Sequence, residues 1–278
     1  MPHYTHMGVM KIAVAQIGSV RGAALQNAET VAGWLERAAA DGCAFVAFPE
    51  CGLTGYVFHD RAGLAGAAIP ASGPEVALIV ETCRRLAIHT VVGLFERDGE
   101  RVYNTALLIG PQGVVGSHRK RHLPFLGGDR FADEPGGIEP SVFDTPVGKI
   151  GIAICYEIRF PEVVRTLVLS GAEIVVLPTN WPAQSHILAD LFTPVRAAEN
   201  FVYFLAANRN DTEDRSEFMG SSQIVDPTGH VLVHAGTQTG LFAAEVDLNR
   251  SRDKRIVFES GEFEISPFRD RKPGTYRL

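Results

Sequence analysis

The regular alternation of short apolar runs with segments of helical periodicity constrains the fold of this chain most. Residues 10–16 read MKIAVAQ, a β-type run, and the segment that follows has apolar residues at helical spacing. A second run at 44–48 and a second helical pattern at 74–87 repeat this order. The first helix is expected to bury one face, formed by Val31, Leu35, Ala38 and Ala39.

The same alternation continues to about residue 246 and predicts an α/β layered core in one mixed domain. Two helices are expected at 161–170 and 187–200. Neighbouring β-type runs at 90–117 and 222–246 favour antiparallel additions to the sheet. The remaining strands are expected at 90–95, 102–109, 114–117, 149–154, 173–177, 201–206, 222–225, 231–234 and 241–246.

Composition and charge exclude several classes of protein. The chain has 278 residues with 46% hydrophobic content, enough for a substantial core, and a net charge of −6 without any basic block. Nucleic acid is therefore not an expected partner. No run approaches the roughly 20 apolar residues of a membrane span, and MPHYTHMGV at 1–9 lacks the pattern of a secretion signal. No membrane contact and a cytoplasmic location are expected, with 1–9 as a disordered or tag-like segment.

The cysteines are too few and too scattered for a disulfide framework, and no pair has the C-x-x-C spacing of a zinc site. An important cysteine is therefore expected to be a free thiol. The four are Cys43, Cys51, Cys83 and Cys155.

Chemically unusual residues follow several of the expected strands at the point where each ends. Glu50 comes directly after an apolar strand, where desolvation raises the pKa of a carboxyl group. Lys120 follows the run that ends at Ser117, and Cys155 follows the strand KIGIAI. Asn180 and Trp181 follow the strand at 173–177. Because ligands collect beyond the carboxyl ends of strands in open α/β sheets, we expect these residues to converge.

An acid, an amine and a thiol together suit nucleophilic catalysis at a carbonyl or nitrile carbon. A neighbouring cation and the start of the following helix favour the thiolate of Cys155. Lys120 and the backbone N–H of Tyr156 can stabilise the negative charge that develops on the substrate. Glu50 can take the thiol proton, pass it to the leaving amine and then activate water.

Each residue also has a purely structural interpretation. Cys155 and Trp181 suit a hydrophobic core, Glu50 a cap, Lys120 a solvated charge run, and Asn180 a turn. A Cys–His pair is a competing route to thiol catalysis, and the available histidines are His118, His122 and His186. The H-x-x-x-H spacing of His118 and His122 lacks a convincing carboxylate, so no zinc site is expected and His122 is assigned a structural hydrogen bond.

Three ordered motifs make the chain resemble the nitrilase, or carbon–nitrogen hydrolase, superfamily, whose enzymes use Glu, Lys and Cys. The motifs are FPE at 48–50, RKRHL at 119–123 and ICYEIRFPE at 154–162. Further similarity lies in PTNW at 178–181, RAAEN at 196–200 and GSSQIVDPTG at 220–229. The resemblance covers residues from about 10 to 247.

This resemblance implies a four-layer αββα sandwich with two mixed β-sheets, pairing of subunits through helices into a homodimer or higher homo-oligomer, and no cofactor. It assigns Glu50 as general base, Lys120 as stabiliser of the tetrahedral intermediate and Cys155 as nucleophile. Tyr156, Asn180 and Trp181 are expected to contact the substrate. The resemblance also implies that residues 10–278 form one carbon–nitrogen hydrolase domain, with an arm from about 249 in which 265–276 is a candidate subunit contact.

The second carboxylate of the family pattern is ambiguous in this chain. Family members often carry a glutamate a few residues before a Pro-Gly pair, and here Asp129 stands at that place before Pro135. Glu134 is the competing candidate, but it immediately precedes the proline. Asp129 is the preferred assignment.

The expected activity is an amidase that cleaves a small carboxamide to a carboxylate and ammonia through a thioester. The resemblance of the CYEIRFPE segment to amidase-type branches favours an amide substrate. Hydrolysis of a nitrile or an N-carbamoyl compound is an alternative within the superfamily, because pocket shape decides the substrate. A non-catalytic binding protein on the same fold is the alternative of a different class.

Overall fold

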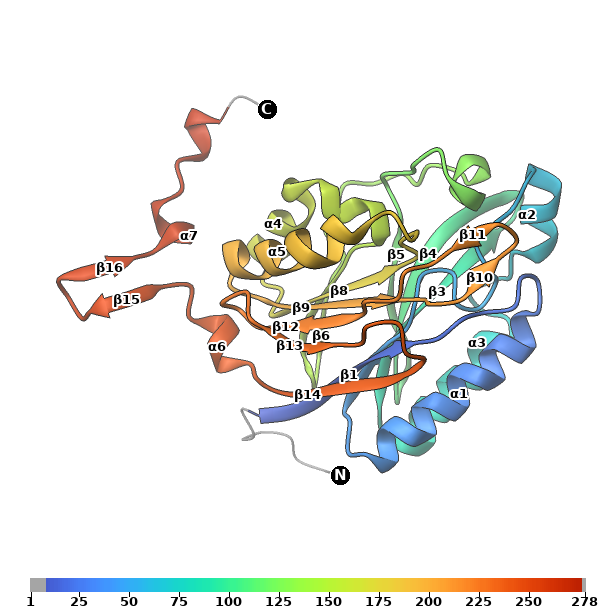
Figure 1. The fold of residues 1–278 in the computed structure, drawn as a ribbon, viewed down its shortest axis with the longest axis horizontal. Coiled ribbons are helices and arrows are strands. Elements are labelled where there is room, and N and C mark those ends of the chain that lie inside the picture. Colours follow the sequence, from blue (N-terminus) through green and yellow to red (C-terminus); the bar gives the residue numbers. More distant parts are fainter. Residues whose placement is uncertain (1–8, 277–278) are drawn as a thin grey trace.

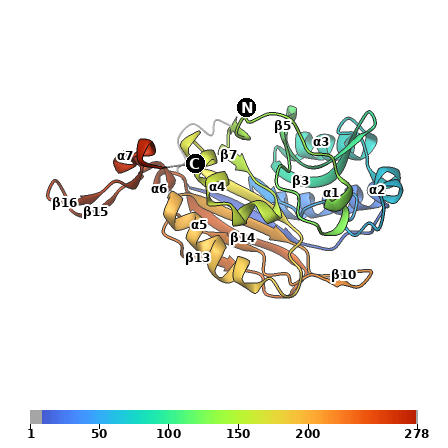
Figure 2. The same ribbon diagram turned by 90° about the horizontal axis from the view of Figure 1, so that it is seen from above.

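Two β-sheets lie face to face and carry helices on their outer sides in the computed structural model, which describes residues 9–276 (Figure 1; Figure 2). Each sheet has six strands. The layers follow the order helix, sheet, sheet, helix, which confirms the expected αββα sandwich. Residues 1–8 of the expected N-terminal segment lie outside the described residues, and Val9 already belongs to the first strand.

The first sheet has the strand order β14-β1-β2-β3-β4-β5. β1, β2 and β3 are parallel, while β14, β4 and β5 are antiparallel to their neighbours. Helices α1 (Ala24–Ala40) and α3 (Pro74–Leu86) cover its outer side. The strands are β1 (Val9–Gln16), β2 (Phe45–Ala47), β3 (His89–Asp98), β4 (Arg101–Gly110), β5 (Gly113–Arg119) and β14 (Gly240–Asp247).

The second sheet has the order β13-β12-β9-β8-β7-β6 and is covered by α4 (Pro161–Leu169) and α5 (Thr193–Asn200). The helix expected at 187–200 is present and contains a π-helical turn, η3 (Leu188–Phe192), which continues directly into α5. Pro194 at the start of α5 cannot donate a backbone hydrogen bond, which accounts for the local change in hydrogen bonding. The strands are β6 (Val142–Thr145), β7 (Gly148–Ile152), β8 (Ile174–Thr179), β9 (Tyr203–Asn208), β12 (Gln223–Val225) and β13 (Val231–His234).

The alternation of side chains along β1 shows why its apolar run is continuous. Ile12 and Val14 point into the core between the two sheets, where they join Ile152 and Val176. Ala13 and Ala15 point the other way, into the core beneath α1 and α3. Both faces of the strand are therefore buried, as the period of two requires. As expected, α1 buries Val31, Leu35 and Ala38, while Ala39 is half-buried.

The region 222–246 adds antiparallel strands, as expected, but it adds them to both sheets. β12 and β13 form a hairpin at the edge of the second sheet. β14 crosses to the first sheet instead and pairs with β1 along its whole length, from Val9–Asp247 to Gln16–Gly240. A sequence pattern identifies a strand but not its partner, and here the same stretch of chain closes the edges of both sheets.

Several short elements fall in regions where no periodicity was evident. Residues 256–265 project away from the sandwich as an arm (Figure 1), while Lys254 and Phe268 on either side of the arm contact Phe201. These elements are α2 (Arg61–Ala67), β10 (Thr212–Glu213), β11 (Ser216–Glu217), α6 (Asn249–Arg252), β15 (Ile256–Glu259), β16 (Phe263–Ile265), α7 (Pro267–Asp270) and η4 (Pro273–Thr275).

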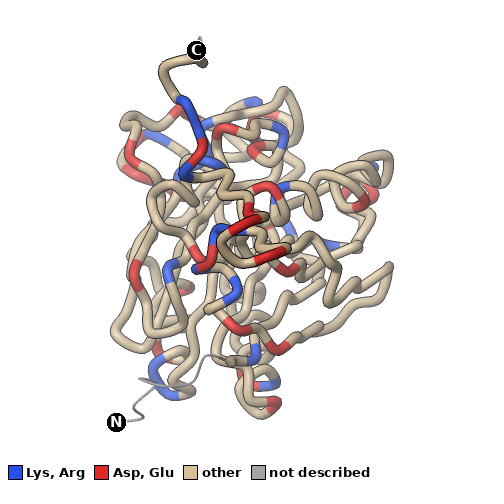
Figure 3. Tube along the Cα trace, turned by 90° about the vertical axis from the view of Figure 1, so that its left-hand side faces the viewer, with Lys and Arg blue, Asp and Glu red and all other residues tan. Residues whose placement is uncertain are grey.

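Charged residues of both signs are interspersed over the trace, as Figure 3 shows. None of the helices formed by residues 9–276 is long and apolar enough to cross a membrane.

Candidate active site

Cys155 stands at a sharp bend between β7 and a short 3-10 helix, η2 (Cys155–Arg159). Its φ of 46° lies in the left-handed region, which costs a residue other than glycine about 1–3 kcal/mol. The bend leaves the thiol close to Thr179 and Asn180 at the end of β8, and both residues lower the pKa of the thiol. This strained position was not evident from the sequence.

Lys120 extends from the residue after β5 into the interior and is 1% exposed. Its Nζ donates to Oε1 of Glu50 at 2.7 Å and to Oδ2 of Asp129 at 2.6 Å. Because an ammonium group has three protons, one remains for another acceptor. The two carboxylates therefore hold Lys120 in place without exhausting its donors.

Asn104, in the middle of β4, completes the carboxylate cluster and was missed in the sequence. Its Nδ2 donates to Oε1 of Glu50 at 2.8 Å and to Oδ1 of Asp129 at 2.7 Å. Its backbone carbonyl accepts from the Lys120 N–H at 2.8 Å. A polar amide inside the otherwise buried strand VYNTALLIG was the available signal.

The charges in this cluster shift one another's pKa values. Burial, opposed by Lys120 and assisted by Asp129, raises the pKa of Glu50 above its ordinary value, as the sequence predicted. Burial alone would lower the pKa of Lys120, but Asp129 and Glu50 raise it well above its usual range. The lysine is therefore charged, and Glu50 is a stronger base than an exposed glutamate.

The environment of the thiol differs from the expectation that the thiolate is favoured. Burial, and then the Glu50 carboxylate, raise the pKa of Cys155 to about 12 against the opposing effect of Lys120. The thiol is therefore protonated at neutral pH. A protonated thiol needs a nearby base to remove its proton as it attacks the substrate, and Glu50 is the candidate base.

Several buried polar atoms at the site have no partner in the described part of the chain. Oε2 of Glu50 is one of them, although Oε1 of the same carboxylate accepts two hydrogen bonds. Neither polar atom of the Asn180 side chain has a partner, and the residue is only 2% exposed. Unpaired polar groups are costly in an interior, and at a reactive thiol they indicate a place for substrate.

Comparison with known proteins is consistent across sequence and structure. The family model described as carbon–nitrogen hydrolase matches residues 11–256. This chain belongs to the carbon–nitrogen hydrolase family. The "Nitrilase" of Pyrococcus abyssi is 36% identical over 225 residues, which cover 80% of this chain and 84% of the relative.

Two amidases further illustrate the relationship. The "(R)-stereoselective amidase" of a Pseudomonas species is 32% identical over 264 residues, covering 90% of this chain and 89% of that protein. The crystal structure of an amidase from Nesterenkonia superposes with a TM-score of 0.76 at 24% identity, covering 89% of this chain and 94% of that one. The fold of this carbon–nitrogen hydrolase is thus that of a nitrilase-superfamily amidase.

The two candidates for the second carboxylate of this hydrolase occupy different environments. Asp129 is 2% exposed in the short 3-10 helix η1 (Gly127–Phe131) and contacts Lys120 and Asn104. Its Oδ2 also accepts from the Tyr56 hydroxyl at 3.0 Å. Glu134 is exposed at the surface. The structure therefore brings Asp129 into the cluster and leaves Glu134 outside.

The histidines near the site have structural partners. His118 lies between Ser141 and Glu157, at 2.8 Å from the Ser141 Oγ and 2.7 Å from Oε2 of Glu157. His122 lies 3.4 Å from Oε1 of Glu157, which is the structural role expected for it, and His186 is exposed. The structure thus does not favour a Cys–His pair. Among residues 9–276, no group of His, Cys, Asp or Glu is arranged to hold a metal ion.

The expected substrate contacts differ in their surroundings. Asn180 lines a cavity of about 260 Å3 together with Tyr56, Phe125 and Arg130. Trp181 is 1% exposed and belongs to the core around the second sheet, although its indole N–H has no partner in the described residues. Tyr156 is half-buried and packs edge-on against Phe160.

Proposed function

We propose that this protein hydrolyses a small carboxamide to a carboxylate and ammonia through a thioester on Cys155. Glu50 acts as the general base and acid, Lys120 stabilises the oxyanion, and Asp129 holds Lys120. The observation that carries the proposal is that Oε2 of Glu50 has no partner among residues 9–276: one oxygen of this buried carboxylate is fixed by Lys120 and Asn104, and the other is available for a proton.

The first half of the reaction forms the thioester. Glu50 takes the proton of the Cys155 thiol as the sulfur attacks the amide carbon. The carbonyl oxygen becomes an oxyanion and accepts from the remaining proton of Lys120 and from the backbone N–H of Tyr156. Glu50 then gives its proton to the leaving nitrogen, the C–N bond breaks, and ammonia departs.

The second half restores the enzyme. Glu50 takes a proton from a water molecule as the water oxygen attacks the thioester carbon. The same donors stabilise the second oxyanion, the C–S bond breaks, and the sulfur recovers its proton from Glu50. Ionic partners keep Lys120 charged through both steps, so it acts as a fixed positive charge rather than as a proton carrier.

The names of the relatives favour an amide as substrate. Besides the Pseudomonas enzyme, relatives named "Omega-amidase NIT2" in Danio rerio and "2-oxoglutaramate amidase" in Bacillus subtilis are 31% and 32% identical to this chain. The presence of all four charged and nucleophilic side chains in one buried cluster disfavours a non-catalytic binding protein.

Ammonia release from matched primary amides, nitriles and N-carbamoyl compounds tests the proposal. Turnover of amides is expected, and rapid acid quench should show an acyl mass on the wild-type protein. Cys155→Ala should lose both turnover and the acyl mass while staying folded. Near-normal turnover by that variant would sink the mechanism, and preference for nitriles or N-carbamoyl compounds would reassign the substrate.

We further propose that the protein self-associates through its C-terminal arm. Strands β15 and β16 are exposed on both faces, and Phe258 and Phe263 are 64% and 66% exposed. An isolated two-stranded hairpin is at best marginally stable, so a second copy that covers it would stabilise both. Light scattering at several concentrations should show a dimer or larger species, and Phe258→Ser with Phe263→Ser should weaken it. A fully active wild-type monomer at all concentrations would contradict this proposal.

A further inference from the structure

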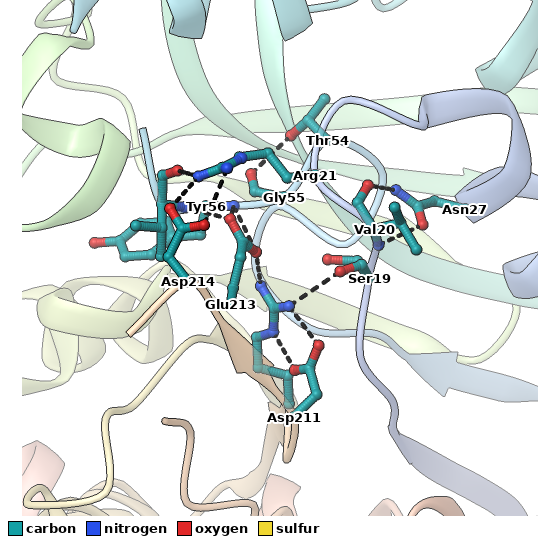
Figure 4. Close-up of polar contacts among 12 residues, drawn as sticks. Ser19, Val20, Arg21, Asn27, Thr54, Gly55, Tyr56, Asp211, Glu213 and Asp214 are labelled. Carbon is teal, nitrogen blue, oxygen red and sulfur yellow. Dashed lines mark hydrogen bonds and ion pairs between the residues drawn. The ribbon is translucent and has the colours of Figure 1, made fainter. Parts of the chain in front are cut away.

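A buried ion pair between Arg209 and Glu213 contacts none of the reacting groups directly. It is connected to them through the loop that carries Tyr56. Arg209 is 1% exposed, just beyond β9, and its NH1 donates to Oε2 of Glu213 at 2.5 Å. The same guanidinium donates to both carboxylate oxygens of Asp211 and to the carbonyl of Ser19 at 3.1 Å. Arg209 therefore holds one oxygen of Glu213 in place, and Asp211 and the Ser19 carbonyl hold Arg209 in turn (Figure 4).

The free side of Glu213 is turned toward the loop between β2 and α2. Its Oε1 accepts from the backbone N–H of Val57 at 2.6 Å and from that of Tyr56 at 3.1 Å. Figure 4 shows this carboxylate pointing at Tyr56, while the neighbouring Asp214 pairs with Arg21 at the surface. Two successive backbone donors on one buried carboxylate fix the orientation of the peptide that carries the Tyr56 side chain.

Tyr56 in turn contacts the segment that carries Asp129 at two points. Its hydroxyl donates to Oδ2 of Asp129 at 3.0 Å, and its carbonyl accepts from the Gly128 N–H at 2.8 Å. A Cβ on Gly127 would lie 2.4 Å from the Tyr56 ring, so the two segments are in close contact. Oδ2 of Asp129 is also the oxygen that binds Lys120.

We propose that Glu213 is a positioning residue for hydrolysis: with Arg209, it holds Tyr56 so that the tyrosine hydroxyl keeps Asp129 oriented toward Lys120. This inference rests on the proposed function of the site. Glu213 touches no reacting group, and its effect passes through Tyr56. If Glu213 only stabilised the β10–β11 hairpin, its loss would lower the melting temperature without changing the chemistry.

A double-mutant cycle tests the connection. Glu213→Gln keeps the size of the side chain but has a single acceptor oxygen, so it cannot accept from Arg209 on one side and from the Tyr56 and Val57 N–H groups on the other at the same time. A small misplacement of catalytic groups costs on the order of a hundredfold in rate, so kcat should fall roughly tenfold to a hundredfold with little change in KM. Tyr56→Phe removes only the hydroxyl and should give a similar fall. The double variant should be no worse than the poorer single variant, since the two act in series.

Asp214→Asn is the matched control. It removes the adjacent carboxylate, whose ion pair with Arg21 is about one-third exposed at each side chain, and activity should stay within about twofold. Circular dichroism and melting temperature establish folding of each variant. If Glu213→Gln does not fold, Glu213→Asp, which keeps the charge and shortens the reach, takes its place in the cycle.

The rate of Cys155 alkylation by iodoacetamide, measured against pH, provides a readout that needs no substrate. Glu213→Gln and Tyr56→Phe should shift this profile in the same way, and Asp214→Asn should not. Additive losses in the cycle, or full kcat and an unchanged alkylation profile in Tyr56→Phe, would overturn the inference. Failure of the wild type to hydrolyse any amide would instead reject the proposed function, with the alkylation profile still deciding whether Glu213 acts on the site.

Discussion

Glu50 and Glu157 are equally buried carboxylates, at 1% and 0% exposed, whose oxygens are used in opposite ways. Both oxygens of Glu157 are occupied: Oε2 accepts from the Ile154 N–H at 2.8 Å and Oε1 from the Arg121 N–H at 3.0 Å. His118 adds a contact to Oε2. Glu50 has one occupied oxygen and one that is free among residues 9–276.

The different use of the two carboxylates indicates a structural role for Glu157 and a chemical role for Glu50. Burial by itself raises the pKa of Glu157, but His118, His122 and the Ile154 N–H outweigh it and hold the pKa far below its ordinary value. The same burial prevails at Glu50 and raises its pKa, because Asp129 offsets part of the effect of Lys120. Glu157 is therefore a permanent anion that joins the Lys120 segment to the Cys155 bend, while Glu50 is able to exchange a proton.

The largest expected effect is a loss of turnover when Glu50, the carboxylate with one unpaired oxygen among the described residues, is changed. Glu50→Gln keeps an oxygen for Lys120 and Asn104 but cannot take the thiol proton. General-base catalysis contributes about 10² to 10⁴ in rate, so kcat should fall by that amount while the melting temperature changes little. Steady-state kinetics and thermal unfolding measure the two. A Glu50→Gln protein with nearly full kcat would remove the distinction between the two carboxylates.

A smaller loss of turnover is expected at Asp129. Asp129→Asn keeps the shape and deletes the charge that holds Lys120, so kcat should fall roughly a hundredfold, comparable with losing an oxyanion donor. Glu134→Ala is the control, because its side chain is exposed, and should have a mild effect. Circular dichroism must first show both proteins folded. If Glu134→Ala loses turnover while Asp129→Asn keeps it, Glu134 belongs in the site and the assignment of Asp129 is wrong.

The sequence predicted the site residues that lie at the ends of strands. Glu50, Lys120 and Cys155 each come shortly after an expected strand, and the topology of two facing sheets brings such ends together. The αββα architecture followed from the alternation of elements together with the family resemblance. What local periodicity predicts is the existence of an element and the face it buries.

Contacts between distant segments could not be predicted in the same way. Asn104 lies 54 positions from Glu50, and Glu213 lies 157 from Tyr56, so no spacing rule connects them. The pairing of β14 with β1 and the positive φ of Cys155 also arise only when the whole chain is folded. The neutral state of the thiol has the same origin, because burial depends on the packing of both sheets.

At Glu157, whose two carboxylate oxygens both accept hydrogen bonds, the main expected effect of a substitution is on stability. Glu157→Gln replaces one acceptor oxygen by an amide donor, which leaves a buried partner unsatisfied and should reduce the free energy of unfolding by about 1–3 kcal/mol. Urea denaturation of folded protein at neutral pH measures it. Glu162→Gln, an exposed change on the adjoining helix, should stay within about 0.5 kcal/mol. Equal stability of both variants would mean that Glu157 does not brace the Cys155 bend.

The smallest effect distinguishes the two carboxylates by the sign of their pH dependence. The folded-state pKa of Glu157 lies below the reference value of 4.5, so its stabilisation is complete above that pH and is lost as the pH falls below it. The folded-state pKa of Glu50 is raised above 4.5, so its contribution is greatest below that value and is lost as the pH rises through the folded pKa. Each group changes the slope by at most about 1.4 kcal/mol per pH unit. Relative to wild type, Glu157→Gln should therefore lose stability as the pH rises from acid toward neutral, and Glu50→Gln should gain it. Urea midpoints of the three proteins across this range measure both trends. Parallel curves for the two variants would show that the folded-state pKa values of Glu50 and Glu157 are not shifted in opposite directions.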